Sequence, residues 1–201
     1  VMCSSDQVYF RKRGEQESLD AYLEPHWEDC IETPEPLYGK QKLQGEELCL
    51  KYQPESVVLR LSWMYDNLTE EELAKGRRNL ATMLREMLDK KQSRKFSDTD
   101  HRGATDVNLV VKNMEAAWKL PGGIYNYGSS NDTNMYETVR RVMASFGQEA
   151  LAEKATGGNV RNLMMRTDKL ARHGIFFPDT AAGLEAFLRK GGAYLKQFRD
   201  E

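Results

Sequence analysis

The alternation of short aliphatic runs with longer amphipathic stretches is the feature that most constrains how this chain folds. Residues 57–61 form a short β-branched and aliphatic run, which is typical of a buried strand. Apolar stripes with helical spacing follow at residues 80–88, 107–118 and 135–146, and residues 124–127 form another short strand pattern. Strands that alternate with amphipathic helices indicate an α/β fold with a mainly parallel sheet.

The first third of the chain divides into three segments. Residues 1–9 form an apolar run that passes into hydroxyl residues, as at the end of a buried strand. Residues 10–35 are polar, acidic and proline-containing, which predicts a surface loop. Residues 36–53 then have the pattern of a helix, and the Thr69-Glu70-Glu71-Glu72 run is a capping box that predicts the start of another.

Composition narrows the class of protein. Forty per cent hydrophobic and 30% charged residues suit one globular unit with a core, and the net charge of −2 indicates no nucleic-acid partner. No apolar run approaches the ~20 residues that a membrane span needs. The three cysteines are unclustered, which favours reduced thiols in a cytoplasmic protein. The three histidines are scattered, so no metal site is expected.

One pair of residues suggests chemistry. Tyr38 and Lys42 are four residues apart on the expected helix, so a phenol and an ammonium lie on one face. The chain has nine tyrosines, and Tyr38 is the one with a lysine four positions later. The pair is also compatible with a half-buried tyrosine beside a solvated lysine. Taken alone, it leaves both interpretations open.

Three further stretches, read together with this pair, point to a family. Residues 38–46 resemble the YGxxKxxGE helix of the extended short-chain dehydrogenases/reductases, and residues 4–9 resemble the strand that carries the catalytic Ser or Thr of that family. Residues 57–65 resemble the LRTSWVY strand of its dTDP-4-dehydrorhamnose reductase branch. Residues 98–105 are similar to the DQxGxPT segment of that branch, with departures where the pattern has Gln and Pro.

The resemblance implies a fold and a reaction. It implies the C-terminal part of a Rossmann-like, doubly wound α/β fold with a small, mostly helical substrate domain. Residues 1–65 would end the nucleotide-binding and catalytic domain, and residues 66–201 would be mainly the substrate-binding region, with residues 105–128 returning to the sheet. The expected reaction is NAD(P)H-dependent reduction of a 4-keto nucleotide sugar, in rhamnose or polysaccharide precursor synthesis.

The same resemblance assigns roles to three catalytic residues. Tyr38 would donate a proton to the ketone oxygen, and Lys42 would tune Tyr38 and hold the nicotinamide ribose. Ser5 would orient the carbonyl with a hydrogen bond, although a serine at a strand end is more often merely polar. The resemblance also implies a nucleotide-sugar substrate. It leaves open whether the protein forms a homodimer.

Asp6, Trp63 and Arg102 are the expected substrate contacts by resemblance. Asp6 would accept hydrogen bonds from sugar hydroxyls, and Trp63 would pack on a sugar ring, unless it only fills the core. Arg102 would pair with the substrate diphosphate, unless it is simply a surface charge.

The set of residues that would bind a dinucleotide cofactor is incomplete in this chain. No Gly-rich dinucleotide turn occurs in the 201 residues, and the chain begins within a strand pattern. We therefore expect roughly 100 residues, with the first βαβ units, to precede Val1. NADP or NAD should then bind poorly to the chain alone. An epimerase or dehydratase of the same superfamily, or a non-catalytic regulatory subunit, remains the alternative.

Overall fold

A three-stranded parallel sheet forms the centre of the computed structural model, which describes residues 1–30 and 32–190. Its strands are β1 (Met2–Ser5), β2 (Val57–Leu61) and β7 (Gly123–Tyr127), in the order β1-β2-β7. The expected α/β class with parallel strands is confirmed. The first strand is shorter than expected because the Ser5 side chain caps the short 3-10 helix η1 (Asp6–Tyr9), which turns the chain away from the sheet.

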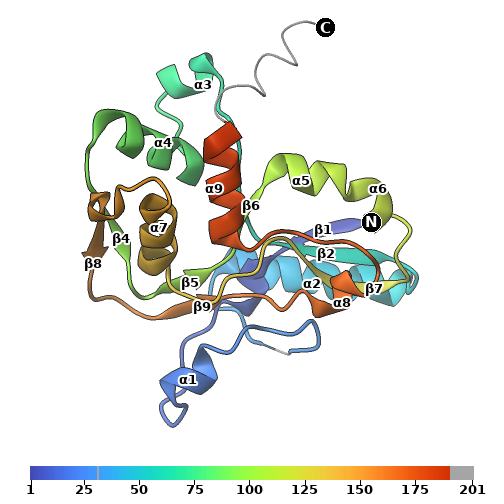
Figure 1. Ribbon diagram of the computed structural model, residues 1–201. Helices are drawn as coiled ribbons and strands as arrows, with labels where there is room; N and C mark the ends of the chain where they lie inside the picture. The colour runs from blue at the N-terminus through green and yellow to red at the C-terminus, as the bar shows by residue number, and fades with distance from the viewer. Residues whose placement is uncertain (31, 191–201) are drawn as a thin grey trace, which may run out of the picture.

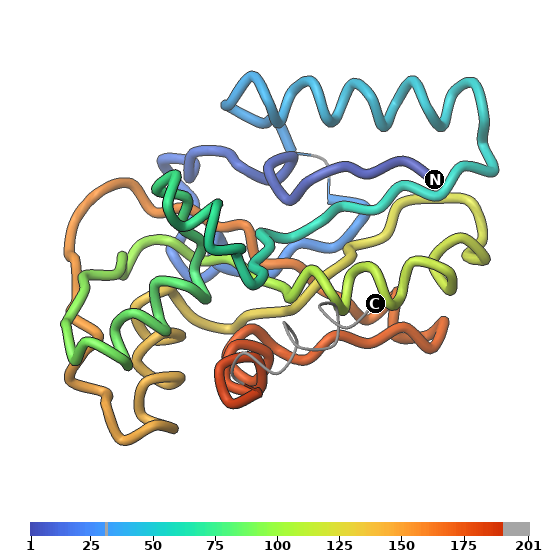
Figure 2. Tube along the Cα trace, turned by 90° about the horizontal axis from the view of Figure 1, so that it is seen from above, coloured from blue at the N-terminus to red at the C-terminus, as the bar shows by residue number. Residues whose placement is uncertain are grey.

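Both faces of this sheet are covered, and Figure 2 shows the covering helices on opposite sides of the strands. Successive residues of a strand point to opposite faces. On one face Leu59 and Tyr125 pack in an apolar cluster with α5 (Val107–Lys112), α6 (Met114–Ala117) and α8 (Asp168–Ala171). The other face is polar, because Ser4, Arg60 and Asn126 align across the three strands, and α2 (Leu37–Tyr52) lies over this row.

Two glycines let helix α2 approach β1 and η1 closely. A Cβ added at Gly39 would lie 2.4 Å from the backbone oxygen of Gln7, and one at Gly45 would lie 2.8 Å from the Met2 side chain. At Gly39 the neighbour is backbone, so only glycine fits there without a shift of the helix, whereas at Gly45 the flexible end of the Met2 side chain could give way. The bounds of α2 agree with the helix expected over residues 36–53, so this prediction is confirmed.

A second core lies beside the sheet, and Figure 1 shows its helices grouped at one end of the molecule. The helices α4 (Leu80–Lys90), α7 (Met135–Ala144) and α9 (Thr180–Lys190) enclose Leu84, Val139 and Leu184, all three fully buried. Burying each such side chain contributes roughly 1.5–3 kcal/mol. The expected capping box is confirmed, with Thr69 and Glu72 bonded reciprocally at the start of α3 (Glu70–Ala74).

Six short strands lie in this region. Residues 63–65 fall in the stretch 57–65 that resembles a strand, whereas the other five strands have no counterpart in the sequence patterns. The six strands form three parallel pairs: β3 (Trp63–Tyr65) with β6 (Ala104–Asp106), β4 (Arg94–Ser97) with β8 (Ala152–Ala155), and β5 (Asp100–Arg102) with β9 (Arg161–Leu163). The segment expected as a loop at residues 10–35 contains a one-turn helix, α1 (Leu19–Tyr22). Much later in the chain, a second 3-10 helix, η2 (Glu149–Leu151), precedes β8.

The outer edge of β7 is closed by side chains. Lys169 Nζ donates to the backbone oxygen of Ile124 at 2.7 Å, and a Glu28 carboxylate oxygen accepts from the backbone N–H of Asn126 at 3.1 Å. The two side chains take the hydrogen bonds that an added strand would make, which protects the edge from pairing. Within residues 1–30 and 32–190, no helix combines the length and apolar character of a membrane span.

Candidate active site

The carboxyl end of β1 carries the residues expected to act on substrate. Ser5 is the last residue of β1, and its hydroxyl donates to the Asp6 carboxylate at 3.2 Å while accepting from the Gln7 backbone N–H at 3.2 Å. These contacts fix the serine side chain at the point where the chain leaves the sheet. In parallel sheets this edge is the usual location of ligand sites.

Helix α2 brings Lys42 to the same strand. Lys42 Nζ donates to the backbone oxygen of Cys3 at 3.0 Å and lies 5.6 Å from the centre of the Tyr38 ring. Cys3 is two residues before Ser5, so the ammonium lies beside the strand that ends in the serine. Tyr38 is 52% exposed, which leaves its hydroxyl open to a ligand. The structure places Tyr38 against Lys42 and Lys42 against β1, while convergence of all three groups on one ketone oxygen stays a prediction.

Asp6, Arg102 and Trp63 form a single cluster. Arg102 Nη2 donates to Asp6 Oδ2 at 3.2 Å, and the guanidinium carbon lies 4.8 Å from the centre of the Trp63 ring. The Arg102 side chain is only 12% exposed, so the alternative of a surface charge is wrong. Arg102 also covers one face of the indole. A sugar ring could therefore pack on the opposite face of the indole or against the guanidinium of Arg102.

Asp6 supplies the carboxylate of this cluster, and it is deeply buried. Its side chain is 3% exposed, and burial raises the pKa of Asp6, while the positive charge of Arg102 opposes that rise. Arg102 Nε is buried and has no hydrogen-bond partner among the described residues. The cluster thus holds a buried carboxylate directly after Ser5 in the chain and a buried guanidinium N–H that is unpaired among the described residues.

A cavity of about 430 Å³ adjoins this cluster at Trp63. Its lining includes the apolar side chains of Leu80 and Met83 from α4 and of Phe96 from β4, together with the charged residues Arg94, Lys95 and Asp100. The sequence analysis missed these residues because they come from elements far apart in the chain. No local periodicity signals that Phe96 and Trp63 line one space.

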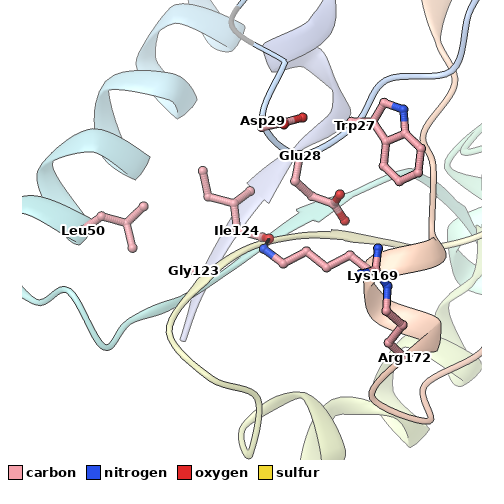
Figure 3. Close-up of a pocket in the computed structure, with 8 residues that line it drawn as sticks. All are labelled: Trp27, Glu28, Asp29, Leu50, Gly123, Ile124, Lys169 and Arg172. Carbon is pink, nitrogen blue, oxygen red and sulfur yellow. Dashed lines mark hydrogen bonds between the residues drawn. The ribbon is translucent and has the colours of Figure 1, made fainter.

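A larger cavity of about 680 Å³ lies at the opposite end of the sheet strands (Figure 3). Trp27, Glu28 and Lys169 line it, together with residues at the amino end of β7. Figure 3 shows Lys169 extended across its floor toward Ile124. None of the residues expected to be catalytic lines this cavity, so we place the active site at the carboxyl end.

Comparison with known proteins identifies the family. The sequence model of the RmlD substrate binding domain matches residues 1–165. The chain belongs to this family. It is 31% identical over 152 residues to the spore coat polysaccharide biosynthesis protein SpsK of Bacillus subtilis (strain 168), covering 74% of this chain and 47% of that protein. The chain therefore spans about half the length of this curated relative.

Solved structures with the same fold include two from Bacillus anthracis str. Ames. The first is a dTDP-4-dehydrorhamnose reductase in complex with NADP, with a TM-score of 0.66 and 15% identity over 94% of this chain and 64% of that one. The second is a dTDP-glucose 4,6-dehydratase in complex with NAD, with a TM-score of 0.66 and 18% identity over 97% of this chain and 63% of that one. At these identities the likeness shows the fold alone, and it confirms the Rossmann-like class.

Proposed function

We propose that this RmlD-family chain is the substrate-binding part of an NAD(P)H-dependent reductase of a 4-keto nucleotide sugar. The observation that carries the proposal is the arrangement at the end of β1, where Lys42 contacts the strand that ends in Ser5 and the Asp6–Arg102–Trp63 cluster follows at once. The similarity to a polysaccharide biosynthesis protein supports a role in rhamnose-type or other polysaccharide precursor synthesis.

The proposed reaction uses three side chains on one carbonyl. A reduced nicotinamide, with its ribose held by Tyr38 and Lys42, would supply the hydride for the carbonyl carbon, so that negative charge develops on the carbonyl oxygen. Tyr38 donates its hydroxyl proton to that oxygen, and the nearby ammonium of Lys42 stabilises the phenolate left behind. Ser5 turns its proton from Asp6 to the same oxygen and holds the ketone in line.

The cavity beside Trp63 suits the nucleotide part of such a substrate. A volume of about 430 Å³ lies within the range of about 300–1,000 Å³ that is usual for small-molecule sites. Leu80, Met83 and Phe96 offer an apolar surface to a base, while Arg94 and Lys95 offer positive charge to phosphates. Arg102 would complete the diphosphate contact and place the sugar near Ser5.

The residues present fit one end of the dinucleotide. Tyr38 is half-exposed, and the Lys42 ammonium donates one hydrogen bond to the backbone oxygen of Cys3 and keeps other N–H donors for ribose hydroxyls. No Gly-rich turn for the pyrophosphate occurs in the sequence. We therefore expect the chain alone to bind NADP or NAD weakly.

A dehydratase is the second candidate, and Asp6 is the observation that favours it. Its carboxyl group adjoins Ser5, and burial raises its pKa, as an acid that donates a proton requires. Arg102 pairs with the same carboxyl group and favours the charged form, which supports the reductase. Mass spectrometry of the product separates the two, because reduction adds two hydrogens and dehydration removes water.

The test is turnover by the protein as its gene encodes it, with whatever residues precede Val1. NADPH or NADH oxidation is followed with a dTDP-4-keto-6-deoxyhexose as substrate. We expect Tyr38→Phe to lower kcat by roughly 10²–10⁴-fold, the usual contribution of a positioned proton donor. Tyr52→Phe is the matched control, because Tyr52 is 76% exposed at the far end of the same helix. Equal rates for Tyr38→Phe and the unchanged protein would refute the role of Tyr38.

Two properties remain part of the proposal. Size-exclusion chromatography with light scattering tests whether the protein forms the homodimer that the sequence leaves open, and a labelled copy in cells tests the expected cytoplasmic location.

A further inference from the structure

A buried ion pair lies one helical turn beyond Lys42. Glu46 and Arg60 are 1% and 3% exposed, and Arg60 Nη2 donates to Glu46 Oε2 at 2.7 Å while Arg60 Nε donates to both carboxylate oxygens at 3.1 Å. The Ser4 hydroxyl also donates to Glu46. The carboxylate of a helix residue is therefore held from two neighbouring strands, β1 and β2.

Arg60 is fixed in turn by the loop that covers this face. Its Nη1 donates to the Tyr9 hydroxyl at 2.7 Å and to the backbone oxygen of Glu28 at 3.1 Å. The Tyr9 hydroxyl donates onward to the Asn126 side chain of β7 at 2.8 Å. Both ends of the ion pair are thus held by groups that are themselves buried.

Apolar packing holds the rotation of helix α2 only in part. Gly39 and Glu46 are its buried residues, whereas the apolar side chains Leu43, Cys49 and Leu50 are half-buried, and Leu43 packs against the cluster that contains Val8 and Tyr9. These side chains do not form a fully buried apolar stripe. A helix without such a stripe is not held in one rotation by hydrophobic packing alone. The glycines permit close approach, but they have no side chain that could pack against the sheet and oppose a rotation of the helix.

We propose that Glu46 and Arg60 are positioning residues that set the rotation of α2, and through it the placement of Tyr38 and Lys42. Tyr38, Lys42 and Glu46 are spaced by four residues, so they follow one another along one face. Side-chain atoms lie roughly 5–6 Å from a helix axis, so a rotation of about 10° moves them by about 1 Å. A misplacement of about 1 Å can cost roughly 10²-fold in rate. This inference rests on the proposed reductase function.

The decisive variant is the double replacement Glu46→Leu with Arg60→Met. Removing one partner leaves a buried charge and is strongly destabilising, whereas replacing both with apolar side chains of similar volume is far better tolerated. The Ser4 and Tyr9 hydroxyls and the Glu28 backbone oxygen each lose a partner in the double variant, so its Tm should lie below that of the unchanged protein but above that of either single replacement. Glu46→Gln keeps the length and an acceptor oxygen, and Glu47→Gln, at an exposed neighbour on α2, controls for the lost charge.

Turnover and structure give separate readouts. In the protein as encoded, we expect the double variant to lose roughly 10²-fold in kcat with KM within about twofold, Glu46→Gln to fall in between, and Glu47→Gln to match the unchanged protein. A folded double variant with full kcat would overturn the inference. So would an equal loss in kcat and in substrate affinity, which indicates general damage.

A crystal structure of the double variant distinguishes failure of the inference from failure of the proposed function. If the unchanged protein reduces no keto sugar, the proposed function fails and the structure alone decides. Lys42 Nζ displaced from the Cys3 oxygen supports positioning by the ion pair, and Lys42 retained there overturns it.

Discussion

Protonation of His26 should make the fold sensitive to acid, and its surroundings give the size of the effect. The His26 ring stacks on Tyr9, with the ring centres 4.4 Å apart, and its side chain is 6% exposed. Burial, reinforced by the positive charges of Arg11 and Arg60, lowers the pKa of His26 to about 4. A hydrogen bond to the backbone oxygen of Asn162 and the charge of Glu17 oppose that change. Glu32, which faces the other ring nitrogen at 3.6 Å, is itself paired with Arg11.

The direction follows from comparing folded and unfolded chains. In the unfolded chain the histidine binds a proton below about pH 6.5, but in the folded protein it does so only below about 4. Acid therefore favours the unfolded chain within this window. Stability is fully present above about pH 6.5 and is lost as the pH falls toward about 4, by roughly 3 kcal/mol for this one group.

Urea unfolding at pH 7, 5.5 and 4 measures this loss, with His26→Gln as the comparison that cancels other titrating groups. The difference in unfolding free energy between the unchanged protein and His26→Gln should shrink by roughly 3 kcal/mol from pH 7 to pH 4. A His26→Gln difference that does not change with pH refutes the reasoning.

Three other outcomes follow from the packing and the candidate site. Gly39→Ala should destabilise the protein by roughly 1–3 kcal/mol in urea unfolding, because its Cβ would lie 2.4 Å from the Gln7 oxygen, while Gly14→Ala, with 3.6 Å to its nearest neighbour, should change little. Glu46→Ala should cost roughly 3–5 kcal/mol by the same measurement, since Arg60 is left buried and unpaired, and a loss below about 1 kcal/mol would contradict this. Arg102→Lys should weaken dTDP binding in calorimetry by about tenfold, because lysine lacks the planar fork, and unchanged affinity would exclude Arg102 from the diphosphate site.

The elements predicted from sequence are those with strong local signals. Helix α2 combines a long helical pattern with a proline before it, and its bounds were expected to within a residue. Strands β2 and β7 are aliphatic or aromatic runs bounded by turn residues, so they too are visible locally. The three parallel pairs β3–β6, β4–β8 and β5–β9 were missed because strands of three or four residues carry no readable period, and their partners are distant in sequence.

The candidate site divides in the same way. Ser5, Tyr38 and Lys42 were found through a pattern of nearby residues, whereas the cavity beside Trp63 depends on how α4 and β4 come together. Arg60 did carry a signal, since an arginine inside the aliphatic run Val57–Leu61 needs a buried partner. The sequence does not show that this partner is Glu46, because the choice among the acidic residues is made by the tertiary fold.

Hydride transfer is the most direct test of the central claim that this site reduces a keto sugar. NAD(P)H that carries deuterium at the transferring carbon is incubated with the encoded protein and a 4-keto nucleotide sugar, and the product is examined by NMR and mass spectrometry. The account predicts deuterium on the former carbonyl carbon, formed much more slowly by Tyr38→Phe. A product without deuterium at that carbon, or none at all from the unchanged protein, would contradict it.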